Sequence, residues 1–242
     1  MTPMNNTLLT MSQAAEYLGV SQNTLRRWDK NGKLPAIRKD GGTHRYYSQK
    51  DLDLFENDLL ALAHDWAYEG TDFPKQFHCE NTAVFQARLT KFENLLMSQI
   101  GYEQLFSLIV AVAGEIGNNS FDHNLGKWPD ELGIFFGYDL NKHYVVLADR
   151  GLGILETLRQ VRPDLPTHTE ALRVAFIEVL SGRSPEKRGN GLKYVRVVVS
   201  ENPFDLFFAS GDAEARIQDP EKQLRITKSP NVLRGCFAIL KF

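Results

Sequence analysis

Three polar residues recur at intervals of four in one predicted helix: Glu115, Asn119 and His123. An α-helix turns 100° per residue, so each step drifts by only about 40° and the three side chains share a stripe. An apolar stripe on the same predicted helix, 105–123, overlaps its edge and contains Leu105, Leu108, Ile109, Val112 and Ile116. Inward-facing polar groups cost free energy unless they are paired, which favours a pocket for a polar ligand or metal. A buried hydrogen-bond network or a fraying helix end remains the alternative.

Two glycine-containing turns follow this helix along the chain. Residues 145–148 predict a buried strand that leads into Asp149, Gly151 and Gly153, where the glycines let a ligand approach the backbone closely. Asp149 offers an acceptor suited to an exocyclic amine. Further on, the run Arg-Gly-Asn-Gly-Leu at 188–192 precedes an apolar helix whose free amide groups are suited to a phosphate.

In this order, the three segments resemble the N, G1 and G2 boxes of the GHKL ATPase superfamily. The superfamily includes the DNA gyrase B subunit, the ninety-kilodalton heat-shock chaperones, sensor histidine kinases and anti-sigma-factor kinases. The resemblance covers residues 84–242 and implies an ATP-binding α/β sandwich. Each box alone is a weak signal, whereas three in sequence with predicted strands between them are a strong one.

The resemblance implies a role for each box residue. Asn119 would ligate a Mg²⁺ ion that bridges the phosphates of ATP, and Asp149 would accept a hydrogen bond from the adenine amine. Gly151 and Gly153 would shape the adenine pocket. Glu115 occupies the position that orients or deprotonates the attacking water in members that hydrolyse ATP.

The same resemblance completes the nucleotide site. The remaining candidate nucleotide contacts are His123, Gly189, Asn190, Gly191 and Leu192, of which the last would pack behind the phosphates. Residues 154–188 would form a lid, with Thr167 and Glu170 capping a lid helix that runs to Leu180.

Some features depart from the superfamily pattern. His64-Asp65 lacks the proline that follows the phospho-acceptor histidine of sensor kinases, and the other histidines fit no better. Autokinase activity is therefore disfavoured. Lys193 and Arg216 are the candidates for the lysine that contacts the γ-phosphate in gyrase-like members, and hydrolysis is left open.

The first fifty residues follow the pattern of a helix-turn-helix. They hold eight Lys/Arg against three Asp/Glu, a balance of +5 within a chain of net charge −2. Charge alone is compatible with a phosphate-backbone binder or with a solvated surface. Ser12 is the expected cap of a first helix, Gly19 permits a tight turn, and Ser21 begins a second helix whose Leu25 and Trp28 face the core.

A hairpin follows over residues 36–47, because Asp40-Gly41-Gly42 separates two short stretches. Ser48 and Asp51 then predict the start of another helix. The candidate DNA contacts are Gln22, Asn23, Arg26 and Arg27 in the second helix and Arg38, Lys39, His44, Arg45 and Tyr46 in the hairpin.

The runs Met11–Ser21, Thr24–Trp28, Gly32–Pro35 and Arg45–Tyr47 together resemble the MerR and excisionase family of winged helix-turn-helix domains. The match covers residues 8–56. It implies that the second helix enters the major groove of double-stranded DNA while the wing touches the backbone. A domain that has become a protein-interaction module is the alternative. MerR-like regulators usually dimerise through a long helix after the wing, but residues 51–63 give only a short apolar pattern, so a homodimer stays open.

These segments divide the chain into an α+β arrangement: a winged helix-turn-helix domain at 1–63, a connecting segment at 64–82 and a GHKL-type domain at 83–242. Residues 83–100 predict a further amphipathic helix. The larger domain is expected to contain a mixed sheet. Its candidate strands are 132–138, 143–148, 204–210, 224–227 and 236–242.

Composition narrows the function classes. Two separated cysteines give no disulfide framework or zinc site, and no apolar run is long enough to span a membrane, so a cytoplasmic protein without a membrane partner is expected. The first hypothesis is an ATP-responsive DNA-binding protein that acts in transcription regulation, with ATP and Mg²⁺ as cofactors. The second is a slow ATPase or an anti-sigma-type Ser/Thr kinase targeted to DNA. The third is an adaptor with a vestigial nucleotide site, and a protein partner stays open.

Overall fold

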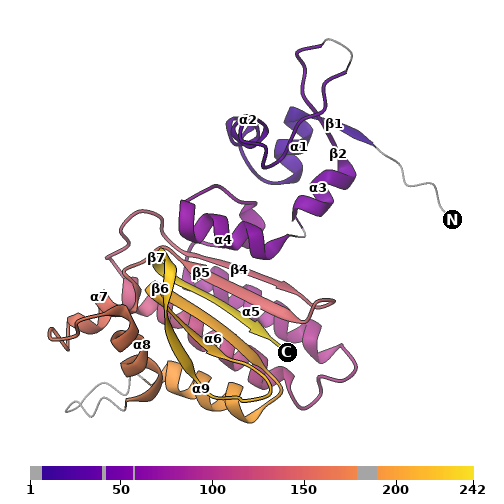
Figure 1. Cartoon of the computed structure of the whole chain (residues 1–242). Coiled ribbons are helices and arrows are strands. Elements are labelled where there is room, and N and C mark those ends of the chain that lie inside the picture. The colour runs from indigo at the N-terminus through magenta and orange to yellow at the C-terminus, as the bar shows by residue number, and fades with distance from the viewer. Residues whose placement is uncertain (1–6, 40–41, 57, 179–189) are drawn as a thin grey trace. The chain divides into compact units, whose positions relative to one another are not determined.

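The computed structural model describes residues 7–39, 42–56, 58–178 and 190–242 (Figure 1). The chain forms two compact units: an N-terminal unit, Met1–Trp66 with Gly70–Phe77, and a C-terminal unit, Ala67–Glu69 with His78–Phe242. The division falls in the segment expected to connect the domains, but that segment is not a plain linker. Helix α4 (Leu59–Glu69) continues into it, and it also holds the short 3₁₀ helix η1 (Lys75–Phe77) and strand β3 (His78–Cys79).

Helices α1 (Met11–Tyr17) and α2 (Gln22–Lys30) form the helix-turn-helix of the N-terminal unit. Gly19 makes the turn with φ +63°, and the Ser21 side chain caps α2 by accepting from the Thr24 amide, as predicted. The predicted cap of α1 was wrong. Thr10 caps it instead of Ser12, because Thr10 and Gln13 form a reciprocal capping box.

The N-terminal unit has its own hydrophobic core. The fully buried side chains of Leu25 and Trp28 on α2 pack with Leu18, Tyr47 and Leu52. Helix α3 (Gln49–Glu56) follows β2 (Tyr46–Ser48), and the Asp51 amide donates to the Ser48 hydroxyl at 3.4 Å, which agrees with the predicted helix start. The residues that the sequence pattern placed inside the domain thus pack into a small core around α2.

The predicted hairpin is only partly regular. Ile37 and Tyr46 form an isolated antiparallel bridge, and the Gly42 amide donates to the Lys39 carbonyl at 2.7 Å. Residues 40–41 of its predicted tip lie outside the described residues. Beyond that bridge, β2 pairs with the N-terminal strand β1 (Leu8–Thr10), with Leu9 opposite Tyr47. The sequence pattern missed this pairing because β1 is only three residues long.

The C-terminal unit is built on one five-stranded sheet with the order β3-β4-β5-β7-β6. Besides β3 it contains β4 (Ile134–Asp139), β5 (Tyr144–Asp149), β6 (Asp205–Ile217) and β7 (Arg225–Lys241). All four pairings are antiparallel, so the expected mixed sheet was wrong. The two strand candidates 224–227 and 236–242 both belong to the single strand β7. This strand pairs with β6, and the pairing register shifts near Gly211.

Helices cover one face of this sheet: α5 (Thr82–Met97), α6 (Phe106–Asn124) and α9 (Gly191–Glu201) (Figure 1). Alternate strand residues such as Phe136, Leu147 and Leu240 meet their apolar stripes in the main core. Two shorter helices, α7 (Gly153–Arg159) and α8 (His168–Ile177), follow β5. The chain is thus mixed α and β, with a small helix-turn-helix unit and a larger sheet unit.

Within the described ranges, the helices are all too short or too polar to cross a membrane.

Candidate functional site

The carboxylate of Asp149, at the end of β5, lies fully inside the C-terminal unit. The Ser120 hydroxyl donates to its Oδ2 at 2.7 Å, and the Gly151 amide donates to its Oδ1 at 2.9 Å. In the described part of the chain no lysine or arginine pairs with it. Burial raises the pKa of Asp149, and the hydrogen bonds only partly oppose that rise.

A small pocket opens beside this carboxylate. Its lining brings together residues from all three predicted boxes, including Asn119, His123, Asp149, Gly153 and Leu192. The helix stripe that the sequence left ambiguous therefore borders a pocket rather than a closed polar network.

The two glycines after Asp149 act differently. Gly153 has φ +75°, and a Cβ there would lie 2.9 Å from the Ser210 hydroxyl, so only glycine suits this position at the pocket wall. Gly151 does not line the pocket. It packs against the side chain of Asn124, whose amide oxygen accepts from the Leu152 amide at 2.7 Å. The absence of a side chain at Gly151 therefore makes room for Asn124 in this loop and not for a ligand in the pocket.

A second pocket adjoins the first and shares Asn119, His123 and Leu192 with it. It extends to Gly191 and Lys193 in the first turn of α9. The ring of His123 is surrounded by enough protein that desolvation lowers its pKa. Together the two pockets extend from Asp149 to the start of α9.

The start of α9 lies directly against α6. A Cβ on Gly191 would lie 2.5 Å from the Glu115 carboxylate and 3.0 Å from the Asn119 amide nitrogen. The Asn190 side chain makes no capping hydrogen bond, so it leaves the first amides of α9 uncapped. Gly189, the other predicted phosphate glycine, lies outside the described residues.

The two candidate γ-phosphate contacts are separated by the fold. Lys193 lines the second pocket, and burial lowers the pKa of its amine. Arg216 lies on β6, pairs with Glu214 and stacks over the Phe207 ring at 4.6 Å. It lines neither of the two pockets. Of the two candidates, Lys193 lines a pocket and Arg216 does not.

The predicted lid is described only in part. Thr167 caps α8 by accepting from the Glu170 amide at 3.2 Å, as predicted. The helix ends at Ile177 rather than at residue 180, because Glu178 is already extended. Residues 179–189 of the predicted lid lie outside the described residues.

The surroundings of Asp149 include residues that the sequence did not single out. Gly235 has φ +84°, and a Cβ there would overlap the Asp149 backbone carbonyl. The Ser210 hydroxyl accepts from the Ile154 amide at 3.0 Å and donates to the Gly235 carbonyl at 2.8 Å. Cys236 lines the pocket beside them, and burial raises the pKa of its thiol. The pairing of β5 with β7 brings Gly235 and Cys236 to the site, which local sequence patterns do not reveal.

In the N-terminal unit, α2 exposes the four side chains predicted to face DNA: Gln22, Asn23, Arg26 and Arg27. Arg26 donates to the Asn23 amide oxygen at 2.6 Å. The opposite side of α2 is buried through Leu25 and Trp28. This arrangement presents polar and cationic groups on one face of a fixed helix.

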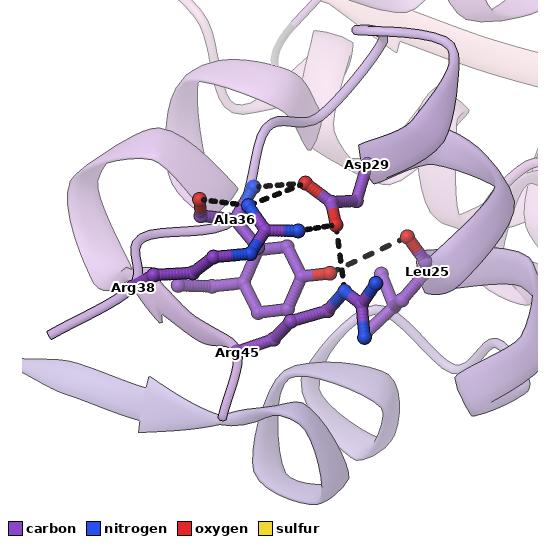
Figure 2. Close-up of polar contacts among 6 residues, drawn as sticks. Leu25, Asp29, Ala36, Arg38 and Arg45 are labelled. Atoms are coloured by element: carbon purple, nitrogen blue, oxygen red, sulfur yellow. Dashed lines mark hydrogen bonds and ion pairs between the residues drawn. The ribbon is translucent and has the colours of Figure 1, made fainter. Parts of the chain in front are cut away.

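Two of the predicted hairpin contacts are engaged within the unit instead (Figure 2). Arg38 and Arg45 each place a nitrogen 2.6 Å from Oδ2 of Asp29, and the Ala36 amide donates to Oδ1 at 2.9 Å. Burial alone would raise the pKa of Asp29, but the bonds from Arg45, Ala36 and Arg38 outweigh it and bring the pKa to about 2. The network therefore ties the hairpin to the end of α2.

The other hairpin candidates face outward. Lys39 and His44 are exposed, and the Lys39 amine lies 4.8 Å from the centre of the half-buried Tyr46 ring. Lys39 and His44 are thus more accessible to a phosphate than Arg45, which is 31% exposed at its side chain.

Residues 8–58 match the family model of a helix-turn-helix domain. The chain is also similar to the type II methyltransferase M.Eco47II of Escherichia coli, with 40% identity over 60 residues, a quarter of this chain and 14% of that protein. An uncharacterized HTH-type transcriptional regulator of Haemophilus influenzae is 32% identical over 87 residues, 35% of this chain and 63% of that protein. The chain thus spans less than two thirds of either relative. The family match agrees with the helix-turn-helix that α1 and α2 form.

A segment after the helix-turn-helix domain contacts α2 within the same unit. Asp72 accepts from the Thr24 hydroxyl at 2.7 Å and pairs with Arg27 at 2.7 Å. Lys33 pairs with Asp65 at 2.9 Å and donates to the Thr71 hydroxyl at 3.1 Å. No local pattern in the sequence predicted these contacts, because they join residues more than thirty positions apart.

Proposed function

We propose that this chain is an ATP-responsive DNA-binding protein that acts in transcription regulation. The match to a helix-turn-helix domain and the exposed polar face of α2 support the DNA-binding part. The resemblance to MerR and excisionase domains adds a docking mode, with α2 in the major groove and Lys39 and His44 of the hairpin near the backbone.

One observation carries the nucleotide part: a fully buried carboxylate at the floor of a pocket, held by neutral donors and unpaired with any described cation. Such a carboxylate is costly unless a ligand supplies further hydrogen bonds. The amine of adenine is such a donor. The resemblance to the GHKL superfamily supports the same assignment.

The phosphates of a bound nucleotide would extend from this floor toward the start of α9. There Lys193 and the first amides of the helix provide positive charge and donors. The described residues contain no cluster of three histidine, cysteine or acidic side chains for a metal. Asn119 fits a Mg²⁺ ion that takes its other ligands from phosphates and water, as this ion commonly does. The bound ion would neutralise phosphate charge.

Calorimetric titration of the full chain with ATP and ADP, with and without Mg²⁺, tests this function. We expect Mg²⁺-dependent ATP binding, and a change in the affinity for duplex DNA when ATP and Mg²⁺ are added. Asn119→Ala should lower the affinity for ATP in the presence of Mg²⁺ by at least about tenfold, because it deletes the metal ligand and part of the pocket wall.

The matched control is Asn118→Ala, on the same helix, whose side chain accepts from Gln86 at 2.7 Å and is not part of either pocket. Equal losses in both variants would show that α6 has been disturbed as a whole. Absence of ATP binding by the unaltered chain would refute the nucleotide part while leaving the DNA-binding part standing.

A further inference from the structure

Asp72 places a negative charge at the edge of the proposed DNA-reading face. On the α2 wheel, Arg27 flanks Asn23 and Arg26 on the exposed side, and Thr24 lies beside it at the margin of the core. The Asp72 carboxylate bridges that margin, because it contacts both Arg27 and Thr24. It therefore occupies the flank where a DNA phosphate would meet Arg27.

The position of Asp72 is fixed by the unit that carries α2. Its segment, Gly70–Phe77, belongs to the N-terminal unit. The hydroxyl of the neighbouring Thr71 accepts from the Lys33 amine. Lys75 packs close to the turn at Gly19, because a Cβ built on Gly19 would lie 3.6 Å from the Lys75 side chain. Asp72 thus stays beside α2 when that helix approaches a ligand.

The ion pair of Asp72 with Arg27 is exposed enough to be exchanged. The side chains are 49% and 55% exposed, so the pair is a surface interaction of small net strength. A carboxylate and a phosphate offer a guanidinium similar oxygen acceptors, and a carboxylate also repels nearby phosphates. Any DNA backbone that approaches Arg27 must either displace Asp72 or tolerate its charge.

We propose that Asp72 is a specificity-determining residue of the DNA interface, which lowers sequence-independent binding by holding Arg27 and repelling backbone phosphates. Sequence-independent affinity comes almost entirely from phosphate contacts, so an acid at this position weakens it more than it weakens base contacts elsewhere on α2. The inference rests on the DNA-binding part of the proposed function and not on the nucleotide site.

The test is binding of the full chain to a short random-sequence DNA duplex across a range of salt concentrations. Asp72→Asn keeps an acceptor for the Thr24 hydroxyl and removes the charge. We expect its affinity for this duplex to rise by about two- to fivefold, and the salt dependence to steepen by about one unit as Arg27 becomes available to a phosphate.

Two comparisons make the test specific. Glu16→Gln removes an equal charge from an exposed position on α1, and it should change affinity less than Asp72→Asn. In an Arg27→Gln background, the gain from Asp72→Asn should shrink to that of Glu16→Gln. An unchanged salt slope in Asp72→Asn, or an equal gain in Glu16→Gln, overturns the inference while wild-type DNA binding stands. Wild-type protein that fails to bind any duplex overturns the proposed DNA-binding function itself.

Discussion

Asp29 in the N-terminal unit and Asp149 in the C-terminal unit are held in opposite ways. Asp29, in the N-terminal unit, lies between two arginines, and its pKa is about 2. Asp149, in the C-terminal unit, accepts hydrogen bonds from neutral groups of Ser120, Gly151 and Cys236, and burial raises its pKa. Two arginines compensate the charge of Asp29, whereas Asp149 is more deeply buried and has no described cation paired with it.

This contrast separates a structural carboxylate from one suited to a ligand. The charge of Asp29 is compensated inside the unit, so it fastens the hairpin to α2 and needs no partner from outside. The charge of Asp149 is not compensated by any described cation, and it faces a pocket. Three substitutions test the comparison, ordered by the expected change in the free energy of unfolding.

The largest effect is expected for Gly235→Ala. A Cβ at this position, with φ +84°, would overlap the Asp149 carbonyl, so β7 must shift next to the carboxylate. Backbone strain and overlap together should cost about 3 kcal/mol or more. Urea unfolding gives the loss, and hydrogen exchange should place it in the C-terminal unit.

Gly32→Ala is the control for backbone strain alone. Gly32 has a similar φ of +75°, but a Cβ there has open space around it. We expect a loss of about 1–2 kcal/mol, confined to the N-terminal unit. Equal losses in the two variants would contradict the claim that Gly235 is required by its closeness to Asp149.

Asp29→Asn should have the next largest effect, about 2 kcal/mol, because two guanidinium groups lose the charge that they share. The folded pKa of Asp29 is lowered, so its contribution to stability is present above the ordinary value of 3.8 and is lost as the pH falls toward about 2. Wild-type protein should lose this stability between about pH 4 and 2, whereas the variant should not.

Glu16→Gln is the matched control for removing one acid from the same unit, since Glu16 is exposed on α1. It should leave the urea midpoint nearly unchanged. A similar loss in Glu16→Gln would mean that net charge, and not the Asp29 network, sets the stability of this unit.

Local signals in the sequence were sufficient for much of the framework. Gly19 and Ser21 specify the turn and the cap of α2 by their own backbone and side-chain chemistry. The four-residue spacing of Glu115, Asn119 and His123 placed them on one stripe of α6, because helical geometry alone relates them. The last two line the pocket, and Glu115 lies against Gly191.

Contacts between distant segments could not be predicted in the same way. The basic hairpin suggested phosphate donors, yet Arg38 and Arg45 bind Asp29, which is nine and sixteen residues away. The role of Gly235 depends on the pairing of β5 with β7, which the sequence pattern did not establish. Asp72 stood in a segment without periodicity, and its contact with Arg27 follows only from the way that segment folds back onto α2.

The smallest change in stability is expected for Asp149→Asn. The raised pKa of Asp149 means that its contribution to stability is present at low pH and is lost as the pH rises through the folded pKa. At neutral pH the neutral amide should therefore leave the urea midpoint unchanged or raise it slightly, in contrast to Asp29→Asn. The same substitution should weaken ATP binding by at least about tenfold, because the adenine amine meets a side-chain amide in place of a carboxyl group with two acceptor oxygens. A loss of stability equal to that of Asp29→Asn would contradict the distinction between the two carboxylates, and unaltered ATP affinity would remove Asp149 from the proposed site.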